Sequence, residues 1–173
     1  MYSHIMVGAN DIEESKKFYD STFAVLGAEP GVLSVNPTGH KRYMYFLDGN
    51  VFLISEPIDD QEATIGNGST IGFAIKSPEQ GEEWHDAGIN NGGTTCEGPP
   101  GIREGMGMKL YLAYLLRCEA DSAFGGRDRC RCQLDGGQIV PAKDAVASAA
   151  ASDQQCLCGS PTPSPAALNR SPL

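Results

Sequence analysis

A strand-turn-helix pattern that occurs twice constrains this chain more than any other feature of its sequence. The first copy, HIMVGANDIEESKKFY, spans residues 4–19, and the second, TIGFAIKSPEQGEEWH, begins 66 residues later and spans 70–85. In each copy a β-type run precedes a helix-capping residue, Asp11 in the first and Ser77 in the second, and a Glu or Gln three positions later completes a capping box. Two such starts in register indicate a duplicated module.

Five further β-type runs follow the two predicted helices. They lie at 31–35, 42–47, 51–55, 92–97 and 108–116. An Asp-Gly-Asn turn at 48–50 favours a hairpin, whereas the segment GPPGIREGMG before residue 108 is typical of a loop. The first module, over about 1–57, therefore has the pattern βαβββ, and the second, over about 67–116, lacks its last strand.

The segment 117–173 differs from the rest of the chain. It has six acidic and six basic residues and one aromatic residue, whereas residues 1–116 have sixteen acidic and seven basic residues. Because such a segment buries little apolar surface, we predict a largely disordered tail, which a reading-frame change or gene fusion would explain. An alternative applies to 129–140, where two strand-like pieces around an Asp-Gly-Gly turn would cover the last edge of the sheet. We expect the six cysteines to be free thiols.

The first 116 residues resemble the vicinal oxygen chelate superfamily, which includes glyoxalase I, extradiol dioxygenases, and fosfomycin- and bleomycin-resistance proteins. The resemblance rests on the segments HIMVGANDIEESKKFYD, DGNVFLISEP, IGFAIKSPEQGEEWHDAGINNGGTTCEGPPGIREG and KLYLAYL. It implies an α+β domain over 1–116, in which paired βαβββ modules form an open mixed sheet around a cavity. It also implies a homodimer that binds a small molecule.

Members of that superfamily hold a divalent metal with side chains from the first and last strands of the modules. The first-strand positions fall at His4 and Thr70, and the last-strand glutamate position, three residues after Asn50, falls at Leu53. The fourth position would lie in the strand that the second module lacks. The resemblance thus makes His4 the best candidate ligand for Zn, Ni, Mn or Fe. Glu56 is the nearest carboxylate and the candidate catalytic base or further ligand.

Several other side chains are candidates for the substrate pocket. They are Tyr43, Tyr45, Phe52, Tyr111, Tyr114 and Arg103. Core packing is the alternative for the aromatic residues, and a solvated pair with Glu104 is the alternative for Arg103. His40 and His85 are weaker candidates, for which a surface histidine is the alternative.

The resemblance favours a metal-assisted, glyoxalase-like enzyme, related to lactoylglutathione lyase, that acts on a small vicinally oxygenated or thiol-conjugated substrate. The alternatives are a metal-free sequestering protein of the bleomycin-resistance type and an inactive variant with an altered C-terminus. The net charge of -9 disfavours nucleic acid and anionic membranes as partners. The sequence has neither a basic leader nor a long apolar run, so we expect a cytoplasmic protein.

Overall fold

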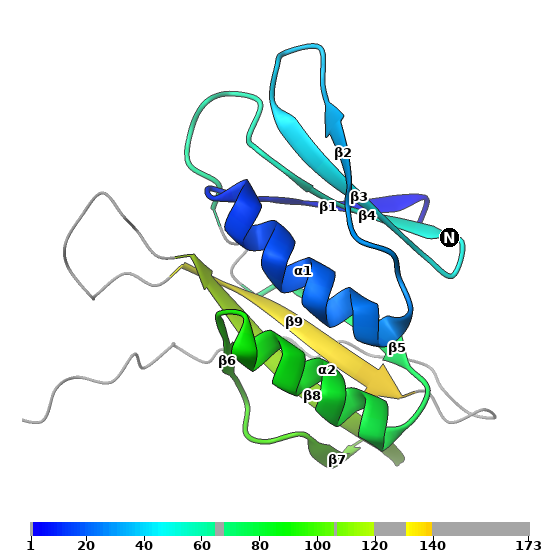
Figure 1. Cartoon of the computed structure of the whole chain (residues 1–173). Coiled ribbons are helices and arrows are strands. Elements are labelled where there is room, and N and C mark those ends of the chain that lie inside the picture. The colour runs from blue at the N-terminus through cyan, green and yellow to red at the C-terminus, as the bar shows by residue number, and fades with distance from the viewer. Residues whose placement is uncertain (1, 65–67, 106, 120–130, 140–173) are drawn as a thin grey trace, which may run out of the picture.

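The computed structural model describes residues 2–64, 68–105, 107–119 and 131–139. These residues form two helices and nine strands, which make two sheets (Figure 1). Helices α1 and α2 run side by side and pack against each other between the two modules. Neither helix, within the part of the chain described, is long and apolar enough to cross a membrane.

The first module has the predicted βαβββ pattern. Its elements are β1 (His4–Gly8), α1 (Ile12–Leu26), β2 (Val32–Val35), β3 (Lys41–Leu47) and β4 (Asn50–Ser55). The strand order is β1-β4-β3-β2, with β1 parallel to β4 and the other pairs antiparallel. The predicted hairpin is confirmed, since Leu47 pairs with Asn50 across a two-residue turn in which Asp48 and Gly49 both have positive φ, 45° and 78°.

The predicted caps place both helices. The Asp11 carboxylate accepts hydrogen bonds from the backbone N–H groups of Glu13 and Glu14, at 3.1 and 2.9 Å. Gly27, with φ of 92°, ends α1 in the left-handed conformation that glycine adopts without strain. Ser77 caps the second helix by accepting from the Gln80 N–H at 3.2 Å. Each helix therefore starts where local hydrogen bonding predicts.

The second module repeats the arrangement with one extra strand. Its elements are β5 (Thr70–Ile75), α2 (Pro78–Asn90), β6 (Gly93–Thr95), β7 (Gly101–Gly105), β8 (Met108–Glu119) and β9 (Arg131–Ile139). The strand order is β5-β9-β8-β6, and β7 pairs with the N-terminal part of β8, from Met108 to Leu112. The segment predicted as a loop before residue 108 thus contains a strand, and β8 continues past Leu116, where the predicted domain ends.

The prediction that the second module lacks its last strand is wrong. Strand β9 lies between β5 and β8, parallel to β5 as β4 is parallel to β1. The Asp-Gly-Gly sequence in β9 is not a turn, because Gly136 and Gly137 pair with residues of both neighbouring strands. The alternative that this segment covers the edge of β8 is confirmed.

The rest of the predicted tail, 120–130 and 140–173, lies outside the described residues. Within the described part, residues 131–139 supply the strand with which the module ends. The hypothesis of a foreign segment beginning at 117 therefore loses its structural motivation.

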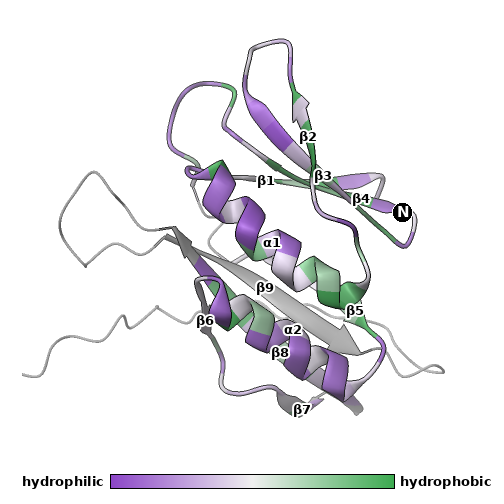
Figure 2. Cartoon of the chain, viewed as in Figure 1, coloured by the Kyte–Doolittle hydropathy of each residue, from purple (hydrophilic) through white to green (hydrophobic). Residues whose placement is uncertain are grey.

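Aromatic side chains fill the core under α1. The ring of Phe23 lies 5.1 Å from those of Tyr45 and Phe52 and 4.9 Å from that of Phe73, measured between centroids. These contacts join the two modules, because Phe73 belongs to β5. In Figure 2 the C-terminal end of α1 is strongly hydrophobic, and this end approaches the junction of the modules.

Candidate functional site

A cavity of about 350 Å³ lies at the junction of the two modules. Strand β1 is one edge of the first sheet and β5 is one edge of the second, and both strands contribute to its walls. The β3–β4 hairpin and the ends of both helices close it. The apolar walls include Ile5, Leu26, Leu47, Phe52, Ile71 and Phe73. We call this cavity the seam pocket.

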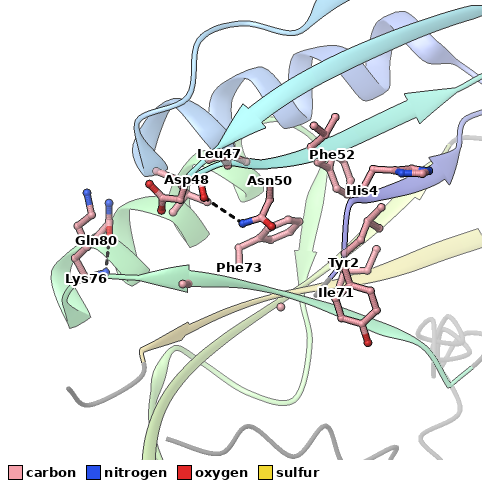
Figure 3. Close-up of a pocket in the computed structure, with 15 residues that line it drawn as sticks. Tyr2, His4, Leu47, Asp48, Asn50, Phe52, Ile71, Phe73, Lys76 and Gln80 are labelled. Carbon is pink, nitrogen blue, oxygen red and sulfur yellow. Dashed lines mark hydrogen bonds between the residues drawn. The ribbon is translucent and has the colours of Figure 1, made fainter. Parts of the chain in front are cut away.

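The seam pocket has polar groups at its two ends (Figure 3). Asp48, Lys76 and Gln80 lie at one end, and Tyr2 and His4 lie at the other. Gln80 is held in place because its Oε1 accepts from the Lys76 backbone N–H at 2.7 Å and its Nε2 donates to the Val25 carbonyl at 2.9 Å. The ends thus offer a carboxylate, an ammonium, a fixed amide and an imidazole to a bound molecule.

His4 lines the seam pocket from the first residue of β1. Its side chain is exposed, and its Nδ1 lies 3.0 Å from the Ser3 hydroxyl. In the parallel ladder His4 pairs with Val51, and Met6 pairs with Leu53. Neither of these residues on β4 carries a metal-binding group, so the first sheet supplies one imidazole and no second donor at this position.

The second sheet adds no donor at the matching positions. Thr70 is the first residue of β5, as His4 is of β1. Because Gly72 pairs with Gly136 as Met6 pairs with Leu53, the fourth ligand position falls on Gly136, which has no side chain. Among the described residues there is no group of three or more His, Cys, Asp or Glu that could hold a metal ion. The set of one imidazole, Leu53, Thr70 and Gly136 does not fit a divalent metal.

The structure does not bring Glu56 to the seam pocket. Glu56 follows β4, at the end of that strand opposite to the hairpin. Its Oε2 accepts from the Lys41 backbone N–H at 2.7 Å, and its own N–H donates to the Lys41 carbonyl at 3.0 Å. The carboxylate therefore extends the β3–β4 ladder, and it is not placed to act together with His4.

Of the three aromatic candidates in the first module, Phe52 alone lines the seam pocket. Tyr43 and Tyr45 are buried beneath α1 and donate hydrogen bonds to its carboxylates. The Tyr43 hydroxyl lies 3.0 Å from Glu13 Oε2, and the Tyr45 hydroxyl lies 3.1 Å from Asp20 Oδ1. Burial, reinforced by the Asp20 carboxylate, raises the pKa of Tyr45 far above its usual range. Tyr43 and Tyr45 therefore anchor α1 to β3 and do not line the seam pocket, which corrects the prediction made from the sequence.

The candidates in the second module also lie away from the seam pocket. The Tyr111 hydroxyl donates to Glu82 Oε1 at 3.3 Å and so links β8 to α2. Arg103 donates to the carbonyl groups of Glu97 and Pro99, at 3.2 and 2.8 Å, and so holds its own loop. Tyr114 is half-buried on β8, and burial raises its pKa. These contacts account for Tyr111 and Arg103 as structural residues.

The two weaker histidine candidates have structural partners. His40 Nε2 lies 3.0 Å from Asp60 Oδ1, and this contact joins the β2–β3 loop to the connection between β4 and β5. His85 is buried on α2, its Nε2 lies 3.1 Å from the Thr95 hydroxyl, and burial lowers its pKa. The surface-histidine alternative is therefore wrong for His85, which belongs to the packed side of α2.

Three polar residues of the seam pocket, Asp48, Lys76 and Gln80, are not predicted by the sequence patterns. Those patterns indicate a turn at Asp48 and a capping box at Gln80. Asp48 does lie in the turn, whereas the Gln80 side chain accepts from the N–H of Lys76, the residue before the cap Ser77. A signal exists, since Asp48 lies in a hairpin turn, and Lys76 and Gln80 lie at the junction of β5 and α2, where polar residues are frequent. Only the packing of one module on the other brings them to the same cavity.

No family model matches the chain, and no curated protein matches it. Among solved structures, a glyoxalase/bleomycin resistance protein from Albidiferax ferrireducens is 47% identical over 82% of this chain and 99% of its own, with a TM-score of 0.65. A glyoxalase-related enzyme from Fulvimarina pelagi is 14% identical over 87% of this chain and 99% of its own, with a TM-score of 0.54.

A mutant of the fosfomycin resistance protein FosX from Listeria monocytogenes, in complex with Mn(II) and a dihydroxypropylphosphonic acid, is also similar. It is 16% identical over 82% of this chain and 93% of its own, with a TM-score of 0.50. At such identity this likeness, and that to the Fulvimarina pelagi enzyme, show the fold alone. The first relative shares both the fold and nearly half of the aligned residues.

Proposed function

Since this chain belongs to the glyoxalase/bleomycin resistance protein family, within the vicinal oxygen chelate superfamily, we propose that it binds a small molecule in the seam pocket without a metal. One observation carries the proposal. The four positions that would hold the metal contain His4, Leu53, Thr70 and Gly136, of which only the first has a donor side chain of the usual kind.

The size and walls of the seam pocket indicate the kind of ligand. A volume of about 350 Å³ lies within the usual range of small-molecule sites. Phe52 and Phe73 offer aromatic faces in its walls, and Asp48 and Lys76 offer charges at one end. The pocket therefore suits a compact aromatic or alicyclic molecule that carries one polar substituent.

A metal-assisted enzyme of the lactoylglutathione lyase type, which the resemblance favours, has less support. Such chemistry needs a metal with open positions that accepts two substrate oxygens, and two or more protein donors beside His4 would be required. The candidate carboxylate for this role, Glu56, lies at the other end of β4.

We would test the binding proposal with 2-naphthol, an aromatic probe with a single hydroxyl group, by fluorescence titration of the full chain. We expect the same affinity with and without EDTA. Replacement of Ala74, which lines the pocket, by Trp should weaken binding at least about tenfold because the indole occupies the cavity. The matched control is Ala87→Trp on α2, which lies outside the seam pocket and should leave the affinity unchanged.

Elemental analysis of the purified, tag-free protein and of His4→Ala distinguishes the two functions. The binding proposal predicts no divalent metal at a stoichiometric level in either protein. Near-stoichiometric Zn, Ni, Mn or Fe that is lost in His4→Ala would overturn it in favour of the metal-assisted enzyme.

A further inference from the structure

The seam pocket has two opposite charges at one end. Asp48 lies in the β3–β4 turn, Lys76 directly follows β5, and both residues line the pocket (Figure 3). Both side chains are exposed, and within the described residues neither the carboxylate nor the ammonium makes a hydrogen bond or an ion pair. We call this part of the pocket, together with Gln80, the charged end. A carboxylate and an ammonium that do not neutralise each other are available to a ligand.

The backbone holds these charged residues in place from two different modules. Asp48 has a φ of 45° in the turn between Leu47 and Asn50, and the Lys76 N–H donates to Gln80 Oε1 at 2.7 Å. The packing of the modules therefore sets the space between the two side chains. An ion pair between exposed side chains contributes little free energy, so a ligand that engages both charges has little to replace.

Gln80 adds a hydrogen-bond donor beside Lys76. Its side-chain amide has two N–H bonds, one of which donates to the Val25 carbonyl at 2.9 Å. Since its Oε1 already accepts from the Lys76 backbone, the second N–H is the group that this amide still offers within the described residues. The ammonium and this N–H suit a carboxylate, whereas the Asp48 carboxylate suits an ammonium.

Aromatic walls begin next to the charged end. Figure 3 shows Phe73 between the charged end and the end with Tyr2 and His4. The rings of Phe73 and Phe52 lie 5.6 Å apart, measured between centroids, in an edge-to-face arrangement, and both residues line the pocket. A third ring extends such a cluster favourably. A ligand whose polar head reaches the charged end therefore places an aromatic side chain against these two rings.

The charges at this end select against simple acids and simple amines. An acid meets Asp48 without a counterion, and the net charge of -9 on the chain repels it. An amine places its own positive charge beside the Lys76 ammonium. A head group that carries both charges on one carbon has a complement for each of them and no net charge.

We propose that the polar substituent of the seam-pocket ligand is an α-amino-carboxylate group and that the ligand is an aromatic α-amino acid. Its ammonium contacts Asp48, its carboxylate contacts Lys76 and Gln80, and its ring lies against Phe52 and Phe73. The inference rests on the proposed function, because it names the ligand class of the same pocket.

Calorimetric titration of the full chain with three probes tests this recognition of the head group. L-phenylalanine carries both charges, 3-phenylpropionate lacks the ammonium and 2-phenylethylamine lacks the carboxylate, and all three share the phenylethyl skeleton. We expect L-phenylalanine to bind at least about tenfold more tightly than either analogue. An affinity for L-phenylalanine that is equal to or weaker than that for either analogue would overturn the proposal.

Two single substitutions separate the two contacts. Asp48→Asn should abolish the advantage over 3-phenylpropionate, because the carboxylate that meets the ammonium is gone, and asparagine tolerates the positive φ of the turn. Lys76→Gln should abolish the advantage over 2-phenylethylamine, and it keeps the backbone N–H that Gln80 binds. The proposal is wrong if both advantages persist unchanged in either variant.

Exposed charges outside the seam pocket provide matched controls. Glu83→Gln on α2 and Lys17→Gln on α1 remove one charge of each sign and should leave both advantages intact. Loss of an advantage in these variants would mean a general charge effect and overturn the proposal. Ala74→Trp should weaken L-phenylalanine binding at least about tenfold, because the indole occupies the pocket, and unchanged binding would place the amino acid elsewhere.

Titration with 2-naphthol, which has no charged group, separates this inference from the proposed function. If 2-naphthol binds in the seam pocket and L-phenylalanine has no advantage over its analogues, the proposed function stands and this inference is wrong. If neither 2-naphthol nor L-phenylalanine binds, both are wrong.

Discussion

Tyr45 illustrates how one side chain can satisfy a sequence pattern for a pocket and still belong to the core. Its hydroxyl donates to Asp20 Oδ1 at 3.1 Å, and the same oxygen accepts from the Gly31 N–H at 2.9 Å. A Cβ atom at position 31 would lie 2.6 Å from Tyr45 Cζ, so this close approach requires glycine. Tyr45 therefore links β3 to α1 at Asp20, and the same carboxylate holds Gly31, which precedes β2.

Replacing Tyr45 by Phe should lower the free energy of unfolding by about 1 kcal/mol, because the Asp20 carboxylate loses a buried donor. Urea unfolding measures this change, and titration with 2-naphthol should show no change in affinity. Tyr111→Phe, which removes a hydroxyl from a contact with Glu82, is the matched control and should have a smaller effect on stability. Weaker 2-naphthol binding with unchanged stability would contradict the structural role and support the prediction that Tyr45 belongs to the ligand pocket.

His85 should make the protein less stable in mild acid. Burial holds the pKa of His85 below its ordinary value of about 6.5, an effect that the Asp86 carboxylate, 4.0 Å from Nδ1, opposes in part. Below that ordinary value the unfolded chain takes up a proton at His85 before the folded chain does. Stability therefore falls as the pH is lowered through about 6.5 and is recovered as the pH rises.

Urea unfolding of the wild-type protein and of His85→Gln at about pH 7.5 and about pH 5.5 tests this expectation. The wild type should lose more stability on acidification than the variant, which lacks the titrating imidazole. His40→Gln, in a loop contact with Asp60, serves as the control. Equal losses in the wild type and in His85→Gln would contradict the expected role of burial.

At the scale of elements, β9 decides whether the second module is complete. It is the one strand of this sheet that lies between β5 and β8, so its backbone satisfies the hydrogen-bonding groups of two neighbours. Its Asp-Gly-Gly sequence is typical of a turn, and the local pattern therefore predicts two short pieces. Pairing with strands on both sides overrides this local preference.

Replacing Gly136 by Pro should destabilise the protein strongly, because proline cannot donate a backbone hydrogen bond and is poorly tolerated in a central strand. Thermal and urea unfolding measure the loss. Gly136→Ala keeps the N–H group and should have a much smaller effect. Similar, small effects of both substitutions would show that β9 contributes little to the folded state.

At the scale of the whole molecule, the outer edge of the first sheet is apolar. Strand β2 is the last in its sheet, and Val32, Leu33 and Val35 are 52%, 52% and 57% exposed. An exposed apolar edge strand favours pairing with another chain. The homodimer implied by the family resemblance therefore stays a prediction, with β2 as the surface to test.

Sedimentation velocity should give the mass of a dimer for the wild-type chain and of a monomer for Leu33→Lys, because a charge on the edge opposes pairing. Lys17→Gln, on the exposed side of α1, should remain dimeric. A monomeric wild type at micromolar concentrations, or a dimer that Leu33→Lys does not affect, would exclude this use of β2.

The sequence by itself determined the local structure of the protein. The caps at Asp11 and Ser77, the end of α1 at Gly27 and the hairpin at Asp48 and Gly49 follow from interactions within about four residues, and all four are present. The family resemblance added the α+β architecture and the position of His4. These predictions needed no knowledge of which distant segments meet.

The tertiary structure alone decided the partners of β9, the burial of Tyr43 and Tyr45, and the composition of the seam pocket. Both faces of β3 are apolar enough to be buried, with two tyrosines on one and Met44 and Phe46 on the other. The packing of α1 selects the tyrosine face. The choice depends on contacts between residues far apart in the chain, and alternation along one strand cannot show which face a helix will cover.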